Sequence, residues 1–151
     1  MPRPVLIAID ASPAHRAILE LAQRYCRPAE QTLHVLLVID PSFAVHAAST
    51  GYTEQERDQY PAACEEQRLA EQAVVQAVET LRAAGFECQG RTVPGVPVEA
   101  ILDVARTLDC ELIVMGHRHL SRLGRLLDPS VSAKVIDQGQ WPVLVAPMQA
   151  P

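Results

Sequence analysis

Four short apolar runs constrain the fold more than any other feature of this sequence. They occupy residues 5–9, 33–39, 112–115 and 143–146. Continuous apolar runs of this length are typical of strands that are buried on both faces, as in a parallel sheet covered by helices. A fifth segment, FECQGRTV at residues 86–93, is more polar and predicts an edge strand.

The segments between these runs have a helical period. Apolar residues recur at i, i+3, i+4 and i+7, which predicts amphipathic helices. The three sets are Ile18, Leu21, Ala22, Tyr25; Ala70, Ala73, Val74, Ala77, Val78, Leu81; and Ile101, Val104, Ala105, Leu108. Pro13, Pro97 and Pro129 stand where helices are expected to begin, and Gly85 stands where the second of these helices should end.

Alternation of strands and helices predicts one doubly wound α/β domain over residues 1–151, with a five-stranded parallel sheet and helices on both faces, as in Rossmann-like folds. The polar third strand belongs at an edge, so the strand order should be 3-2-1-4-5. This order places the switch point between strands 1 and 4, where open α/β sheets bind ligands. It brings Asp10, at the end of strand 1, beside Gly116 at the end of strand 4.

Strand 5 lies at the other edge of this predicted sheet, although it is wholly apolar. An exposed apolar edge promotes aggregation unless something covers it, and pairing with the same strand of a second subunit covers it symmetrically. We therefore expect a homodimer through residues 141–147, centred on Val143, Leu144 and Val145. The alternative is that the C-terminal tail or a helix covers this edge.

Composition excludes several classes of protein. The chain is 48% hydrophobic and 21% charged with a net charge of −5, which argues against nucleic acid or an acidic membrane surface as a partner. No run approaches the length of a membrane span, and we expect no signal peptide. The widely spaced Cys26, Cys64, Cys88 and Cys110 fit no zinc motif and suggest core residues in a reduced, cytoplasmic protein.

Two connections are unusually long. Residues 40–61 are polar, and we expect a mobile surface segment there. A basic loop of about a dozen residues follows Gly116 and ends at Asp128, Pro129 and Ser130, which are typical of a helix start. Long loops between a strand and a helix are often functional.

The whole chain resembles the universal stress protein family. The segments that carry the resemblance are VLIAIDASPAHRAIL, HVLLVID, GVPVEAILDVA, ELIVMGHRHLSRLGRLLDPSVSAKVI and WPVLVAP. The resemblance implies a cytoplasmic stress-response protein that binds an adenine nucleotide, AMP or ATP with Mg²⁺, and that is not an enzyme. It implies that Asp10 and the backbone near Val38 hold the adenosine, and that residues at and around the loop surround the phosphates. These are Gly116, His119, Pro129, Ser130 and Val131, and Met115 is a further candidate for nucleotide binding.

The phosphate loop departs from the motif of ATP-binding members, which is Gly-x-x-Gly, nine residues, then Gly and Ser or Thr. Gly116 and Ser130 match, whereas His119 and Pro129 replace the second and third glycines. Glycine permits positive φ and close approach of N–H groups to phosphate, while proline has no N–H. In addition, Asp128 as an N-cap would occupy the anion site, a conflict of about 1–2 kcal/mol. The sequence thus predicts weak or AMP-like binding.

Three arginines in the loop would strengthen phosphate binding rather than weaken it. Arg118, Arg122 and Arg125 are candidate phosphate contacts, because guanidinium groups bind phosphate with two donors. The alternative is that they are solvated surface residues. We predict no metal site, although His117 and His119 with Asp128 or His15 form an alternative ligand set that no spacing supports.

Catalytic motifs are absent from the sequence: it has neither a Gly-x-Ser-x-Gly elbow nor a Walker A motif, and weak ATPase activity is the residual alternative. Asp10 would bind a ribose hydroxyl or simply cap the following helix. Two function classes remain. One is a nucleotide-sensing stress protein, and the other is a nucleotide-independent dimeric interaction protein that acts through its dimer surface and residues 41–60.

Overall fold

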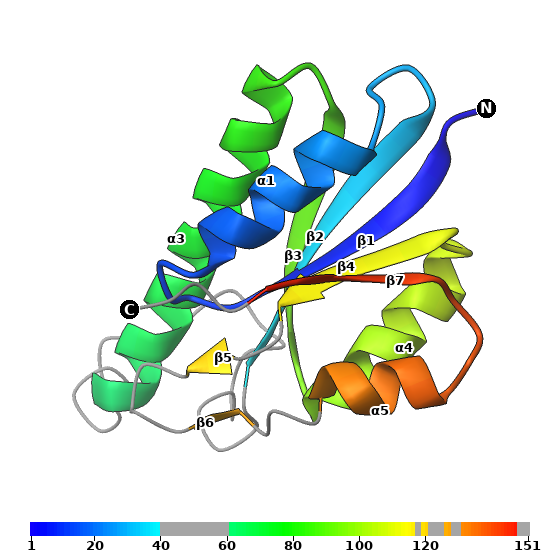
Figure 1. Ribbon diagram of the computed structural model, residues 1–151. Coiled ribbons are helices and arrows are strands. Elements are labelled where there is room, and N and C mark those ends of the chain that lie inside the picture. The colour runs from blue at the N-terminus through cyan, green and yellow to red at the C-terminus, as the bar shows by residue number, and fades with distance from the viewer. Residues whose placement is uncertain (40–60, 117–118, 121–125, 128–130, 148–151) are drawn as a thin grey trace.

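The computed structural model describes residues 1–39, 61–116, 119–120, 126–127 and 131–147 (Figure 1). The elements in chain order are β1 (Arg3–Ile9), α1 (His15–Tyr25), β2 (Gln31–Ile39), α3 (Pro61–Ala83), β3 (Glu87–Pro94), α4 (Pro97–Leu108), β4 (Leu112–Gly116), β5 (His119–Leu120), β6 (Leu126–Leu127), α5 (Val131–Asp137) and β7 (Val143–Ala146). The connection at 40–60 and most of the basic loop lie outside the described residues.

The main sheet has five strands in the order β3-β2-β1-β4-β7, and every neighbouring pair is parallel. The predicted order and fold class are therefore confirmed, with β7 as the predicted fifth strand. The four apolar runs form β1, β2, β4 and β7, and helices cover their side chains. In this sheet β1, β2 and β4 pair with a strand on each side, while β7 pairs with β4. The polar strand β3 lies at one edge, as expected.

Helices cover the two faces of the sheet unequally (Figure 1). Helices α1 and α3 pack on one face, where the buried side chains include Val35 of β2 and Leu81 of α3. Helices α4 and α5 pack on the other, where Leu36, Ile101 and Val135 are buried. Alternate residues of each strand thus enter different cores, which we call the α1/α3 face and the α4/α5 face.

Helix α1 begins and faces the core differently from the prediction. It begins at His15, so Pro13 lies in the preceding turn, whereas Pro97 is the first residue of α4 as expected. The predicted face was wrong at Tyr25, whose exposed fraction is 58%. The buried residues Ile18, Ala22 and Cys26 are spaced at i, i+4 and i+8. The helix ends at Tyr25, whose side chain lies outside this buried stripe.

The other sequence expectations concern loop and core. Residues 117–130 were predicted as a plain loop, but β5 and β6 pair antiparallel within it, beyond the ends of the main strands (Figure 1). Strands of two residues are too short to leave a pattern in the sequence. Cys26, Cys88 and Cys110 are buried free thiols, as expected, and burial raises the pKa of each to about 11. No helix in the described part is long and apolar enough to cross a bilayer.

Candidate functional site

Asp10 follows the last residue of β1 and is buried, with an exposed fraction of 6%. Its Oδ1 accepts a hydrogen bond from the backbone N–H of Ser12 at 2.9 Å and another from the Ser12 hydroxyl at 2.6 Å. An aspartate that bonds the amide two residues on forms an Asx-type turn, which orders the chain between a strand and a helix. The carboxylate is therefore held at the carboxyl edge of the sheet by a local turn.

The first amide groups of α1 find their acceptors in this turn. The N–H of Ala14 donates to Ser12 Oγ at 3.3 Å, and that of His15 donates to Ser12 O at 3.2 Å. Arg16 N donates to Pro13 O at 3.3 Å. Helix α1 therefore does not depend on Asp10 as its N-cap, which weakens the capping alternative for this residue.

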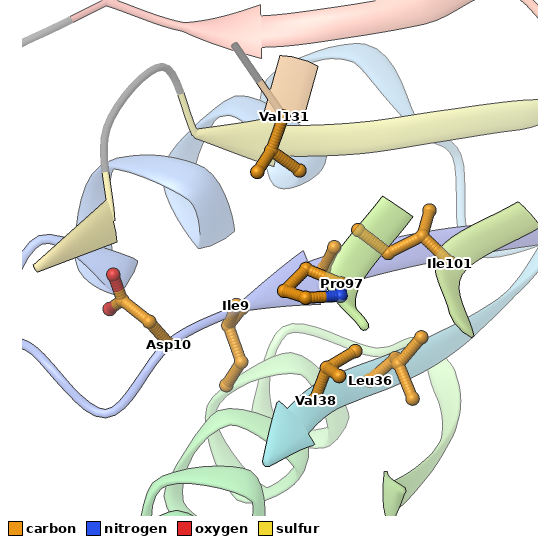
Figure 2. A pocket seen from close by; sticks show the side chains of 8 residues that line it. Ile9, Asp10, Leu36, Val38, Pro97, Ile101 and Val131 are labelled. Carbon is orange, nitrogen blue, oxygen red and sulfur yellow. The ribbon is translucent and has the colours of Figure 1, made fainter. Parts of the chain in front are cut away.

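A small pocket opens beside Asp10 on the α4/α5 face. About 340 Å³ of unfilled space, partly open to solvent, lies among its side chains. Its lining residues are Ala8, Ile9, Asp10, Leu36, Val38, Pro97, Ile101 and Val131. In Figure 2, Val131 lies on one side of the pocket, Leu36 and Val38 lie on the other, and Asp10 lies at its margin. A pocket that is apolar apart from one carboxylate suits a flat apolar group that carries a hydrogen-bond donor.

Three predicted site residues, Asp10, Val38 and Val131, line this pocket together although they come from β1, β2 and α5. Met115 is fully buried in β4, where it pairs with Ala8, and it does not line the pocket. Gly116 is the last residue of β4 and is buried.

The phosphate side of the predicted site is described only in part. His119 belongs to β5, where it pairs with Leu127. The remaining predicted residues lie outside the described residues: His117, Arg118, Arg122, Arg125, Asp128, Pro129 and Ser130. In the part of the chain that the structure does describe, no three His, Cys, Asp or Glu side chains gather as a metal site.

Five apolar lining residues were not predicted as part of the site: Ala8, Ile9, Leu36, Pro97 and Ile101. Ala8 and Leu36 stand two residues before Asp10 and Val38, so the strand period of two places each pair on the same face. That signal was present in the sequence. Pro97 and Ile101 lie one helical turn apart in α4, and their approach to β2 depends on how α4 packs, which no local pattern gives.

A larger hollow of about 1090 Å³ lies elsewhere, between α1 and α3. It is open and lined mainly by exposed polar residues, among them Arg16, Glu20 and Glu79. Volume alone would favour it as a site. We favour the smaller pocket, because it lies at the carboxyl ends of parallel strands and includes a buried carboxylate.

One titratable group lies near the pocket on the same strand face. His34 stands two residues before Leu36 in β2, and its Nδ1 is buried without a hydrogen-bond partner among the described residues. Burial and the positive charge of Arg91 lower the pKa of His34, while the negative charge of Glu87 acts to raise it. The His34 ring is therefore neutral at pH 7.

Comparison with known proteins places this geometry in context. The sequence model of the universal stress protein family matches residues 1–147. Universal stress protein Sll1388 of Synechocystis sp. is 30% identical, over 93% of this chain and 95% of that protein. The solved structure of hypothetical protein MJ0577 has a TM-score of 0.75 at 23% identity and covers 100% of this chain and 99% of that one. The universal stress protein from Archaeoglobus fulgidus in complex with dAMP has a TM-score of 0.61 at 23% identity, over 95% of this chain and 96% of that one.

Proposed function

Because this chain belongs to the universal stress protein family, we propose that its pocket binds an adenine nucleotide and that the protein is a nucleotide-sensing stress protein. The observation that carries the proposal is an apolar pocket at the carboxyl edge of the sheet that ends in a buried carboxylate. A related protein of the same fold is described in complex with dAMP, a nucleotide with one phosphate.

In this proposal the adenine occupies the apolar part of the pocket. Val38 and Val131 flank the base from opposite sides, and Asp10 accepts a hydrogen bond from a sugar hydroxyl. The enclosed part of the pocket is small, about 30 Å³, so in this proposal it takes only part of the base. The phosphates therefore lie outside the pocket, toward the loop that follows β4.

We further propose that the phosphate side is impaired. His119 and Pro129 stand where ATP-binding members of the family carry glycine, and proline removes one N–H donor. AMP should then bind at least as well as ATP, whether or not Mg²⁺ is present. Arg118, Arg122 and Arg125 remain the candidate cationic groups for the phosphate that is bound.

The same departures favour a second candidate, a nucleotide-independent interaction protein. If the pocket is vestigial, function resides in the dimer that we propose through Val143, Leu144 and Val145 of β7. For both candidates we propose a single domain, no catalytic role and a cytoplasmic location.

A thermal-shift titration of the reduced protein with AMP, ADP and ATP, with and without Mg²⁺, tests the first candidate. Ligand at 100 times its Kd stabilises by about 2.7 kcal/mol, which for a domain of this size raises Tm by about 5–10 °C. We expect a saturable shift with AMP that equals or exceeds the shift with ATP. Asp10→Asn, which keeps the shape of the side chain but not its charge, should lose most of the shift.

Two results would contradict parts of the proposal. A larger shift with Mg-ATP than with AMP would show that His119 and Pro129 do not impair the phosphate side. No shift with any nucleotide would favour the interaction protein. The double variant His119→Gly/Pro129→Gly then distinguishes the two candidates, because a shift that appears only in this variant identifies a vestigial pocket.

A further inference from the structure

Ser12 holds the buried carboxylate of Asp10 through two bonds. Its N–H and its hydroxyl both donate to the same oxygen, Oδ1, at 2.9 and 2.6 Å. Two donors on one oxygen fix the rotation of a carboxylate about its bond to Cβ, since any rotation lengthens at least one of the bonds. A carboxylate offers about four acceptor positions, and Ser12 takes two of them. The two bonds from Ser12 therefore restrict the orientation of the Asp10 carboxylate at the margin of the pocket.

His15 in turn holds Ser12. Its ring Nδ1 lies 2.7 Å from the backbone oxygen of Ser12, and its own backbone N–H donates to the same oxygen at 3.2 Å. Because a carbonyl oxygen accepts, Nδ1 must carry the proton. The hydroxyl of Ser12, besides donating to Asp10, accepts the N–H of Ala14 at 3.3 Å. Ser12 is thus fixed at its amide, hydroxyl and carbonyl groups at once.

We propose that Ser12 and His15 are positioning residues of the nucleotide site. They hold the Asp10 carboxylate in the orientation in which it accepts a sugar hydroxyl, and they thereby make the pocket prefer nucleotides that carry ribose hydroxyls. This inference rests on the proposed function of the pocket. Neither residue lines the pocket, so both act through Asp10.

The test compares AMP with 2′,3′-dideoxy-AMP, which lacks both hydroxyls, by titration calorimetry. A hydrogen bond to a charged group is worth a factor of about ten or more in affinity, so the natural protein should prefer AMP by about tenfold. Ser12→Ala should lose most of this preference by weakening AMP alone. Ser12→Thr, which keeps the hydroxyl, should restore it.

A second pair of variants tests His15. The ring of His15→Phe has no donor for the Ser12 carbonyl, whereas the amide nitrogen of His15→Asn can take the place of Nδ1. We expect His15→Phe to reduce the preference for AMP severalfold and His15→Asn to retain it. Arg16→Ala is the matched control, because Arg16 is exposed on the next position of α1 and should leave the preference unchanged.

The outcomes separate this inference from the proposed function. If Ser12→Ala weakens both nucleotides equally, or neither, Ser12 does not position Asp10 for a hydroxyl; the inference fails while the pocket remains a nucleotide site. If the natural protein binds both nucleotides equally, the inference fails in the same way. If the natural protein binds neither, both the inference and the proposed function fail.

Discussion

The two faces of the sheet differ in how completely helices cover them. On the α1/α3 face, the 23-residue helix α3 and helix α1 bury 21 of the described residues in one cluster with the sheet. On the α4/α5 face, helices of 12 and 7 residues bury 11. The pocket opens on this second face, at the carboxyl ends of the strands. The comparison teaches that the larger part of the core lies on the α1/α3 face, while the pocket beside Asp10 lies on the face with the smaller core.

Two valines of β2 give the sharpest test of this comparison. Val35 is fully buried on the α1/α3 face, whereas Val38 is half-buried and lines the pocket on the other face. Val35→Phe should lower the free energy of unfolding by about 3 kcal/mol, because a packed core has no space for the ring. Val38→Phe should change stability by less than about 1 kcal/mol, since the ring enters unfilled space, and should abolish AMP binding.

Urea denaturation and the AMP titration, performed on both variants, measure the two effects. Each variant serves as the control for the other, because strand and residue type are the same. Equal losses of stability would show that the two faces are packed alike. Retained AMP binding in Val38→Phe would show that the ligand does not occupy this pocket.

Gly90 of β3 gives the next largest effect, on the α1/α3 face. A Cβ atom at this position would lie 2.4 Å from Val74 Cγ1 and 2.7 Å from Val78 Cγ2, both in α3. Glycine is therefore required by the close approach of α3 to the edge strand. Gly90→Ala should cost about 2 kcal/mol, or about 4–8 °C in Tm, without changing the Kd for AMP.

Differential scanning calorimetry with and without AMP tests this prediction. Gln89→Ala is the matched control, since Gln89 is the exposed neighbour in the same strand and should have little effect on Tm. An unchanged Tm in Gly90→Ala would show that α3 moves away from the sheet at little cost. A changed Kd would show that the two faces are not independent.

The sequence predicted the sheet well because its strands are buried. Residues such as Val5 and Ile113 are fully buried, so the central positions of their strands must be apolar, and the pattern is visible without a structure. The polar strand β3 then determined the order. The prediction that Tyr25 faces the core was wrong, because the last turn of a helix can direct a large side chain away from the core. Hydrophobic periodicity does not show where the chain leaves the helix.

The candidate site was predictable only where it follows the strands. Asp10 ends a strand at the switch point that the strand order predicted, whereas Val38 and Val131 were expected only from the resemblance to the family. The turn in which Ser12 and His15 hold Asp10 depends on side-chain geometry that spacing does not encode. Pro97 and Ile101 reach the pocket only through the packing of α4 on β2, which is a tertiary property.

His34 gives the smallest effect, and it again concerns the α4/α5 face. Its buried Nδ1 and the charge of Arg91 hold the pKa of His34 below the ordinary value of about 6.5, which it has in the unfolded chain. Between the two pKa values the unfolded chain binds a proton that the folded protein does not. The free energy of unfolding contributed by this group is therefore complete above about pH 6.5 and decreases as the pH falls toward the lowered pKa. His34→Leu should remove this part of the pH dependence.

Urea denaturation at fixed ionic strength, from about pH 8 to about pH 5, measures this slope in the natural protein and the variant. Glu87→Gln tests the pKa of His34 through a neighbouring charge. Because the negative charge of Glu87 raises the pKa of His34, its removal should lower that pKa further and extend the loss of stability to lower pH. Parallel curves for all three proteins would mean that His34 is protonated in the folded state without cost. The α4/α5 face would then admit water around the ring, and its looser packing would extend from the pocket along β2 to His34.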